Sequence, residues 1–213
     1  MEYLNNNLVI NLKHRVDRWN HTLIGFEKLG LKANRFDAIK NQDGRIGCTM
    51  SHIKCLEYAI ENNLDSILIC EDDITFLNPV LLKSCLKNFI ENVNDWDVLL
   101  LGANVNKIEK RCNYCLKIID AQTTTGYIVK NHYFNKLLDN FKEGLQLLKK
   151  EKKPDYCIDI HWKKIQSKDK WYILYPFTVT QYDNYSDIEK RNTDYKKLML
   201  TYTNENKMKM KFF

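Results

Sequence analysis

Three consecutive acidic residues follow an apolar segment in the first half of the chain. Glu71, Asp72 and Asp73 come directly after residues 67–70, whose types are typical of a buried strand. Functional residues of α/β proteins gather at the carboxyl ends of such strands. Neighbouring carboxylates repel one another, and a divalent cation with its bound phosphates would neutralise their charge. The triplet therefore indicates either a metal and phosphate site or a solvated acidic turn that caps the next helix.

A second acidic pair lies later in the chain. Asp155 and Asp159 are four residues apart, so a helix would place them on one face, with His161 close by. A carboxylate is a suitable general base for taking the proton of a hydroxyl group. The pair is therefore a candidate for proton transfer, while helix capping by Asp155 is the simpler structural alternative.

The sequence around the acidic triplet predicts alternating strands and helices. Apolar runs predict strands over residues 8–12, 35–38, 67–70 and 97–102. Periodicity predicts helices over residues 19–29, 53–60 and 79–90, with a flexible loop at 44–47. Asn78 is expected to cap the third helix, with Pro79 in its first turn. The spacing of the last two strands is that of a parallel β-α-β crossover.

The pattern is less regular in the second half. Strands are expected over residues 116–119, 126–129, 171–174 and 177–180. Helices are expected over residues 134–148 and 155–165, with Asp155 as the cap of the second. The alternation predicts an α/β fold with a mixed central sheet flanked by helices. We expect one domain over residues 1–213, made of a nucleotide-binding half (1–105), an acceptor-side half (106–200) and a basic tail (201–213).

Composition and charge narrow the class of protein. The chain has 213 residues and a formal net charge of +6, and its few Gly and Pro residues mark no linker. Its N-terminus is polar and no apolar run is long enough for a membrane span, so a cytoplasmic protein is expected. The basic tail allows at most peripheral membrane contact. The positive charge indicates an anionic ligand without choosing among nucleotides, glycans, nucleic acid and membranes.

The seven cysteines favour thiols over a disulfide framework. Cys55, Cys70 and Cys85 fall within apolar patterns, where a thiol packs as a small hydrophobic group. Cys112 and Cys115 form a C-x-x-C pair, but a structural zinc site needs four ligands and the sequence has no second pair. We therefore expect most of the cysteines to lie in the core.

Four segments together resemble glycosyltransferase family 25, which contains lipooligosaccharide and procollagen galactosyltransferases. They are residues 9–12 with 15–18, residues 47–52 (Gly-Cys-Thr-Met-Ser-His), residues 69–73 and residues 125–127. A weaker fifth segment runs from Pro176 through Gln181 to Ser186-Asp187-Ile188. The segments occur in the order of the family and cover most of the chain, so the joint resemblance is more specific than any one motif.

The resemblance implies a GT-A type fold, with a Rossmann-like half that binds a nucleotide sugar. It implies a metal-dependent inverting transferase that moves a hexose from a UDP-sugar to a hydroxyl of a glycan or glycoprotein acceptor. The cation is usually Mn²⁺, otherwise Mg²⁺, and a cation on the diphosphate acts as a Lewis acid. A role in lipopolysaccharide biosynthesis follows from the same resemblance, and no nucleic-acid partner is expected.

The resemblance and the chemistry of the residues together suggest roles for individual residues, with those of residues 155–162 based on their spacing and types. Asp73 is the expected direct metal ligand, and His161 is a second candidate ligand. Donor contacts are expected from Asn11, Arg15, Arg18, Ser51, His52, Glu71, Asp72 and Gln181, with Ser51 and His52 at the start of a helix. Asp159 is the expected base and Asp155 the reserve, while Trp162 is a candidate platform for a sugar ring. The family pattern Pro-Val-Asp is shortened to Pro154-Asp155 here.

Two other functions remain open from the sequence. A sugar-phosphate nucleotidyltransferase would use the same nucleotide-binding half, but a glycine-rich phosphate loop near the first strand is missing. A non-enzymatic basic module for glycans or nucleic acid would need clustered basic residues interleaved with exposed aromatic residues. The basic runs are short, and the aromatic residues mostly follow core spacing.

Overall fold

The computed structural model describes residues 2–201. The strands are β1 (Asn7–Asn11), β2 (Arg35–Asp37), β3 (Ser66–Glu71), β4 (Ile74–Phe76), β5 (Val98–Arg111), β6 (Cys115–Lys130), β7 (Trp171–Leu174), β8 (Val179–Gln181), β9 (Asn184–Ser186) and β10 (Arg191–Thr193). The helices are α1 (Val16–Lys28), α2 (Gly44–Glu61), α3 (Pro79–Asn92), α4 (Phe134–Glu151), α5 (Ile158–His161), α6 (Lys163–Gln166) and α7 (Lys196–Leu200), with 3-10 turns η1 (Glu2–Leu4), η2 (Asn131–Tyr133) and η3 (Pro154–Tyr156).

The central sheet has six strands in the order β2-β1-β3-β6-β5-β7. Strand β1 pairs in parallel with β2 and β3, whereas β6 pairs antiparallel with both β3 and β5. The mixed sheet flanked by helices is therefore confirmed. The expected crossover between β3 and β5 connects strands of the same direction, but they are not neighbours, because the β5–β6 hairpin inserts β6 between them.

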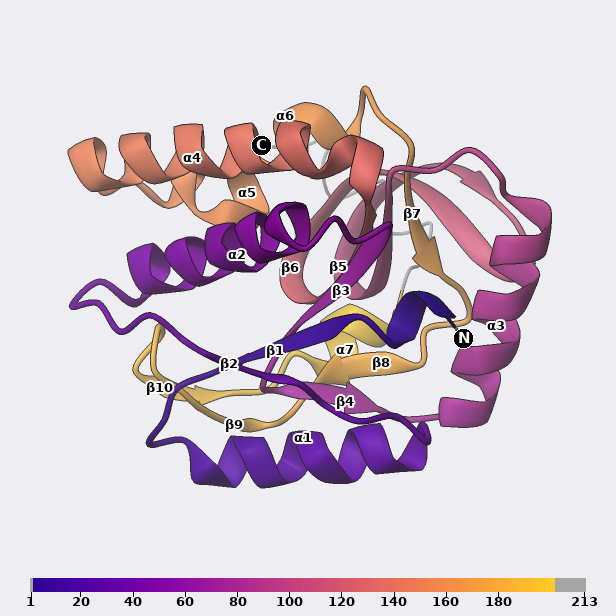
Figure 1. Ribbon diagram of the computed structural model, residues 1–213, viewed down its shortest axis with the longest axis horizontal. Coiled ribbons are helices and arrows are strands. Elements are labelled where there is room, and N and C mark those ends of the chain that lie inside the picture. The colour runs from indigo at the N-terminus through magenta and orange to yellow at the C-terminus, as the bar shows by residue number, and fades with distance from the viewer. Residues whose placement is uncertain (1, 202–213) are drawn as a thin grey trace.

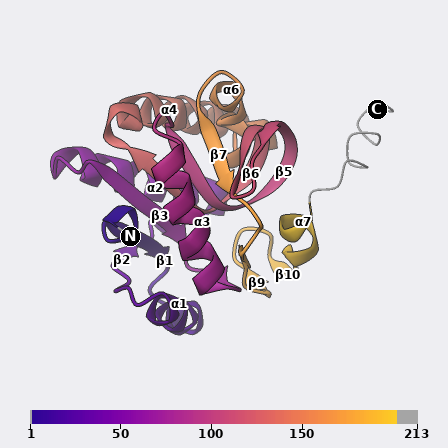
Figure 2. The same cartoon turned by 90° about the vertical axis from the view of Figure 1, so that its right-hand side faces the viewer.

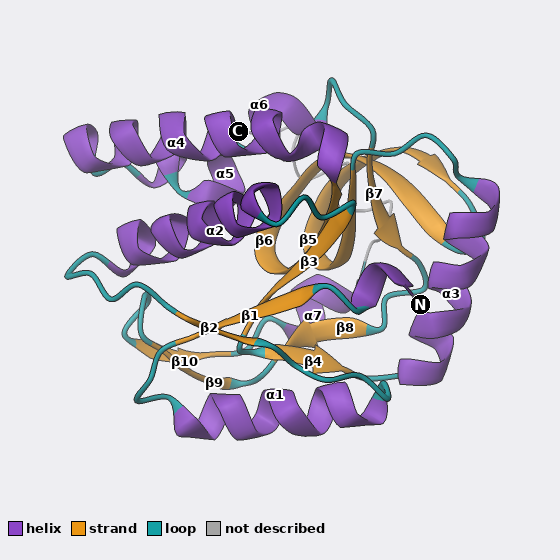
Figure 3. Ribbon diagram, in the orientation of Figure 1, coloured by secondary structure: helices purple, strands orange, loops and turns teal. Residues whose placement is uncertain are grey.

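Helices cover both faces of the sheet, as Figures 1 and 3 show. Side chains of alternating strand positions point to opposite faces, so each face has its own apolar cluster. Ile67 and Ile69 of β3 pack in the cluster that includes residues of α2 and α4. Leu68 and Cys70 pack in the other cluster, with residues of α1 and α3. The sheet is thereby held between two helical layers, and the carboxyl end of β3 is fixed in position.

Several boundaries differ from the sequence expectation. The loop expected at 44–47 is wrong, because α2 begins at Gly44, where the Asp43 side chain accepts a hydrogen bond from the backbone of Arg45. The two strands expected at 116–119 and 126–129 are one continuous strand, β6. Asn78 caps α3 as expected, accepting from the backbone of Leu81 at 3.0 Å. The cap predicted at Asn78 is correct because it depends only on a side chain and a backbone N–H three residues apart in the sequence.

Two small strand pairs lie beside the central sheet. Strand β4 pairs antiparallel with β8, and β9 pairs antiparallel with β10. Helix α7 packs against β5 and β8, near the β9–β10 pair (Figure 2). Within residues 2–201, none of the helices combines the length and apolar character required to cross a bilayer. The basic tail from Lys207 onward lies outside the described residues.

Candidate active site

A cavity of about 550 Å³ opens at the carboxyl ends of β1 and β3. This volume is in the range of roughly 300–1,000 Å³ that is usual for small-molecule sites. One wall comes from α2, another from the bend of β6 and from α5, and a third from the segment around β9 and β10. Its polar lining includes Arg18, Ser51, His52, Glu71, Asp72, Asp73, Asn104, Thr124, Asp159, Gln181 and Glu189. The cavity therefore brings together most of the residues predicted from the sequence.

Arg18 pairs with the last two residues of the acidic triplet. Its Nη1 donates to Asp72 Oδ1 at 2.7 Å, and its Nη2 lies 3.3 Å from Asp73 Oδ2. Asn11 is fully buried and donates to Asp72 Oδ2 at 2.7 Å. Asp72 is thus held by two side chains, and Asn11 lies behind it without lining the cavity. Burial, partly offset by Arg18, raises the pKa of Asp72 above its usual value.

Asp73 has one carboxylate oxygen without a partner. Its Oδ1 is buried and accepts no hydrogen bond from the described residues. Burial and then the charge of Glu71 raise the pKa of Asp73 to about 8, although Arg18 acts in the opposite direction. Gln181 Oε1 and Asn104 Oδ1 are also buried and unpaired within residues 2–201, and both residues line the cavity. Each of these oxygens could accept a hydrogen bond from a bound molecule or coordinate a cation.

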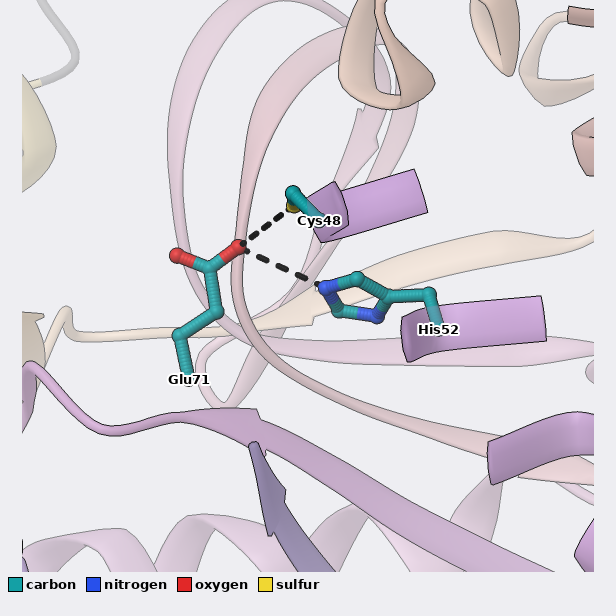
Figure 4. A group of neighbouring side chains, drawn as sticks. All are labelled: Cys48, His52 and Glu71. Atoms are coloured by element: carbon teal, nitrogen blue, oxygen red, sulfur yellow. Dashed lines mark hydrogen bonds and ion pairs between the residues drawn. The ribbon is translucent and has the colours of Figure 1, made fainter. Parts of the chain in front are cut away.

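Glu71 collects polar contacts on one of its two oxygens. Thr124 Oγ1 donates to Glu71 Oε1 at 2.5 Å, and His52 Nε2 lies 3.4 Å from the same oxygen. Cys48 Sγ is 3.8 Å away from it (Figure 4). Burial raises the pKa of Glu71, but the contacts with His52 and Thr124 more than offset this, so the pKa lies below its usual value. Of the three carboxyl groups, Glu71 is the one whose pKa is lowered, whereas those of Asp72 and Asp73 are raised.

Asp159 lines the cavity from the short helix α5. Its Oδ2 accepts a hydrogen bond from the backbone N–H of Thr123 at 3.1 Å. Thr123 has a φ of 81°, which is unusual for a β-branched residue. Strained backbone of this kind concentrates at functional sites. Burial, with a smaller contribution from Glu71, raises the pKa of Asp159 above its usual value, which suits a group that exchanges a proton.

Arg15 is not directed into the cavity. Its guanidinium binds Asp17 through Nε and Nη2 and pairs with Asp187 through Nη1. Nη1 also donates to the backbone oxygen of Tyr185 at 3.0 Å. Arg15 does not line the cavity, whereas Asp187 does. The residue joins the start of α1 to the β9 segment that forms a cavity wall, so it supports the wall from behind.

Ser51 and His52 lie in the middle of α2 and not at a helix start as expected. Ser51 Oγ donates to the backbone oxygen of Gly47 and accepts from the backbone of Ile39 at 2.9 Å. These contacts tie α2 to the loop after β2. The Ser51 side chain is fully buried and already has both a donor and an acceptor partner, whereas His52 points toward Glu71.

Three residues that the sequence suggested for the site, the reserve base and two neighbours of Asp159, do not line the cavity. Asp155 is exposed in η3, and the expected cap is wrong, because Cys157 occupies the cap position of α5. His161 is buried against α4, with Nε2 3.4 Å from Glu143 Oε2, and it does not line the cavity. Trp162 is fully buried and its Nε1 donates to the backbone oxygen of Ala121 at 3.0 Å, so the sugar platform expected there is wrong.

Sequence reasoning missed Asn104, Cys48 and Thr124 as individual residues of the cavity. Cys48 lies within the Gly47–His52 motif and Thr124 lies in the three-threonine stretch, so both had a signal in the sequence. Asn104 had a weaker signal, a polar residue inside a long apolar strand. Asn104 lines the cavity next to a register shift of the β5–β6 pairing, between Gly102 and Asn104.

The cavity lining includes oxygen ligands of the kind that a hard divalent cation binds. Such ions take carboxylate and amide oxygens as ligands. The unpaired oxygens of Asp73, Gln181 and Asn104 are of these two types, and Asp73 is the ionisable one. The arrangement is therefore compatible with the predicted cation, with Asp73 as the residue that would hold it.

The fold and this oxygen-lined cavity define a GT-A type protein. Among solved structures, UDP-glucose pyrophosphorylase complexed with UDP-glucose has the same fold, with a TM-score of 0.50 and 9% identity, covering 84% of this chain and 93% of that chain. The model of "Glycosyltransferase family 25 (LPS biosynthesis protein)" matches residues 41–144. This part of the chain is therefore similar to glycosyltransferase family 25, the family whose motifs the sequence resembles.

Curated relatives agree with this assignment. Procollagen galactosyltransferase 1 of Danio rerio is 30% identical over 105 residues, covering 45% of this chain and 17% of the relative. A glycosyltransferase 25 family member of Anopheles gambiae is 24% identical over 165 residues, covering 61% of this chain and 28% of the relative. The match thus spans less than a third of the length of either relative.

Proposed function

We propose that this chain is a metal-dependent inverting glycosyltransferase that moves a hexose from a UDP-sugar to a hydroxyl of a glycan or glycoprotein acceptor. The observation that carries the proposal is the charge balance at the end of β3. Three carboxylates, Glu71, Asp72 and Asp73, lie side by side at the cavity. Among the described residues, their cationic partners are Arg18 and, when protonated, His52.

A bound cation would complete this charge balance. When present, it would neutralise the charge that grows on the departing diphosphate, as a Lewis acid. Asp73 would hold it, since its Oδ1 is buried and has no other partner within residues 2–201. Arg18 contacts the carboxylates of both Asp72 and Asp73 and so holds the two side chains in place without the ion.

The donor is expected to occupy the cavity between α2 and the β9 segment. Asp72 is held by Arg18 and Asn11, and its contact with the donor is inferred from its place in the cavity lining. Gln181 Oε1 is an unpaired acceptor for a donor hydroxyl or a cation. Arg15 would act indirectly, by holding the wall around Asp187 in place.

Asp159 is the proposed base. Its carboxylate would accept the proton of the acceptor hydroxyl while that oxygen attacks the anomeric carbon. The bond between the anomeric carbon and the diphosphate oxygen breaks, and its electron pair leaves with UDP. Attack from the side opposite the leaving group inverts the configuration. The Thr123 N–H would hold the carboxylate of Asp159 in one orientation during this step.

Binding and transfer can be tested separately. Calorimetry with Mn²⁺ and UDP should detect binding to the wild type, and Asp73→Asn should lose Mn²⁺ binding while keeping its fold by circular dichroism. Asp139→Asn, an exposed charge on α4, is the matched control and should bind normally. Absence of both Mn²⁺ and UDP binding in the folded wild type contradicts the proposal.

The reaction class needs a second experiment. A panel of UDP-sugars with glycan acceptors should yield transfer that stops with a chelator and returns with Mn²⁺, and proton NMR of the product should show the inverted anomer. Formation of a UDP-sugar from UTP and a hexose 1-phosphate, without transfer, would instead identify a nucleotidyltransferase.

A further inference from the structure

Cys48, His52 and Glu71 form a cluster of three metal-ligating side chains on the α2 side of the cavity (Figure 4). The Cys48 Sγ, a ring nitrogen of His52 and a carboxylate oxygen of Glu71 all lie within 4.8 Å of one another. We propose that this cluster is a second cation site, specific for a borderline-soft transition metal such as Zn²⁺ and separate from the oxygen site at Asp73.

Two of the three ligand separations are close to those around a tetrahedral zinc ion. Zinc bonds of about 2.0–2.3 Å to N, O and S at tetrahedral angles separate the ligand atoms by roughly 3.3–3.6 Å. Here Glu71 Oε1 lies 3.4 Å from His52 Nε2 and 3.8 Å from Cys48 Sγ. The third separation, between Cys48 Sγ and the His52 ring nitrogen, is at most 4.8 Å, so binding would draw these two side chains together around the ion.

The chemistry of the ligands selects the metal. Thiolate and imidazole favour Zn²⁺ over Mn²⁺, Mg²⁺ and Ca²⁺, which prefer oxygen ligands. Three protein ligands with one open position is the arrangement of zinc sites that exchange a fourth ligand. The oxygens at Asp73, Gln181 and Asn104 have the opposite preference. The cluster would therefore prefer Zn²⁺, and the oxygen site at Asp73 would prefer a harder cation such as Mn²⁺ or Mg²⁺.

The surrounding residues orient the ligands. Cys48 and His52 are four residues apart on α2, so they project from one face of the helix. His52 Nδ1 lies 2.8 Å from the hydroxyl of Tyr127. That contact leaves Nε2 facing Glu71, which is how a metal-binding histidine is usually fixed. Thr124 holds the Glu71 oxygen from the other side at 2.5 Å.

The cluster is reachable, because Cys48, His52 and Glu71 all line the cavity. On coordination the Cys48 thiol loses its proton to solvent, and the thiolate binds the ion. Zinc at this position would occupy Glu71 and hinder donor binding. This consequence for activity rests on the proposed transferase function, whereas zinc binding itself does not.

Cobalt is a suitable probe, since Co²⁺ takes the place of Zn²⁺ and its thiolate complex has a sulfur-to-metal charge-transfer band in the near ultraviolet. The folded wild type should bind one Co²⁺ with this band, and Zn²⁺ should displace it. Cys48→Ser should abolish the band and weaken zinc binding at least about 100-fold, more than loss of an outer partner. Tyr127→Phe should weaken zinc binding roughly ten-fold or more. Cys48→Ala serves if the serine variant does not fold.

Matched controls identify the source of the band. Cys157→Ser changes another cysteine of the same cavity and should keep the band. Asp73→Asn should keep it too, since that residue belongs to the oxygen site. A band that persists in Cys48→Ser, or that disappears instead in the Cys112→Ser/Cys115→Ser double variant, overturns the proposal. So does the absence of any band in the wild type. Because none of these readouts uses a nucleotide sugar, failure here leaves the transferase proposal intact.

Discussion

Nη1 of Arg18 lies 2.7 Å from Oδ1 of Asp72, which joins helix α1 to the end of strand β3 at the cavity. The side chains of both residues are about one-tenth exposed, at 12% and 9%. A second contact, from Nη2 to Asp73, means that one guanidinium serves two carboxylates. Removal of the arginine would leave buried negative charge without its principal partner.

Arg18→Gln should therefore destabilise the fold, and more so at high pH. Loss of one partner of a buried ion pair costs about 3–5 kcal/mol. Near pH 9 most of the Asp73 carboxyl is charged, whereas near pH 5 it is protonated, because burial and the charge of Glu71 raise its pKa to about 8. Urea unfolding at the two pH values measures the difference. Lys87→Gln, at an exposed pair with Glu91, is the control and should change stability by less than about 1 kcal/mol. Equal losses for Arg18→Gln at both pH values would contradict this reading.

Binding of Mn²⁺ should strengthen with pH up to about 8. The pKa of Asp73 is raised to about 8, chiefly by burial, so at lower pH the cation must displace a proton. Displacement of one proton gives an affinity that rises about ten-fold per pH unit and then levels. Calorimetry between pH 6 and 9 tests this, and an affinity independent of pH would be inconsistent with Asp73 as the ligand.

The same shift predicts how the cation-free protein responds to pH. The folded state binds the Asp73 proton more tightly than the unfolded chain does, whose pKa is about 3.9. The contribution of this group to the free energy of unfolding therefore falls as pH rises from about 4 to about 8. Asp73→Asn should remove that part of the decline, measured by urea unfolding in a chelator.

Asp159→Asn and Asp155→Asn should differ in their effect on transfer. Loss of a general base costs about 10²–10⁴-fold in rate. Asp159 lines the cavity and is held by Thr123, whereas Asp155 is exposed in η3. We expect the large loss of kcat for Asp159→Asn only, with donor KM within a factor of about two. A larger loss for Asp155→Asn would return the role of base to that residue.

Asp187→Asn should loosen the β9–β10 wall of the cavity. The Asp187 carboxylate pairs with Arg15, which also holds the backbone of Tyr185. Hydrogen exchange of residues 184–193 should quicken about ten-fold or less, corresponding to a charge-assisted contact of about 1 kcal/mol, while the unfolding midpoint stays nearly constant. Lys13→Ala, which removes the exposed pair with Asp37, is the control. Unchanged exchange in Asp187→Asn would mean that the pair does not hold the wall.

Gly47→Ala should separate α2 from the loop after β2. A Cβ at this position would lie 2.5 Å from the backbone oxygen of Ile39, and backbone cannot yield as a flexible side chain does. The overpacking should cost about 1–3 kcal/mol of stability. It should also weaken UDP binding, because both segments line the cavity. Thermal unfolding and calorimetry measure the two effects, and a variant with wild-type stability would refute the close-packing argument.

The acidic triplet, the strand before it and the helix cap after it could be predicted from the sequence. Each of these depends on residues close together in the chain: the apolar run ending at Cys70, and the cap and first turn formed by Asn78 and Pro79. The resemblance to glycosyltransferase family 25 was also recognisable, because the motifs occur in order along the sequence. Local chemistry and short-range periodicity are written directly into residue types.

The tertiary structure alone decided which predicted residues meet at the cavity. The sequence could not show that Arg15 turns toward Asp187, 172 residues away, while Arg18 turns toward the triplet. Nor could it show that β6 inserts beside β3 and so brings Thr124 to Glu71. Closeness to Asp159 in the sequence made His161 a candidate metal ligand and Trp162 a candidate sugar platform, yet packing buries both side chains. Contacts between distant segments depend on how whole elements pack, and a residue type does not encode which neighbour it will face.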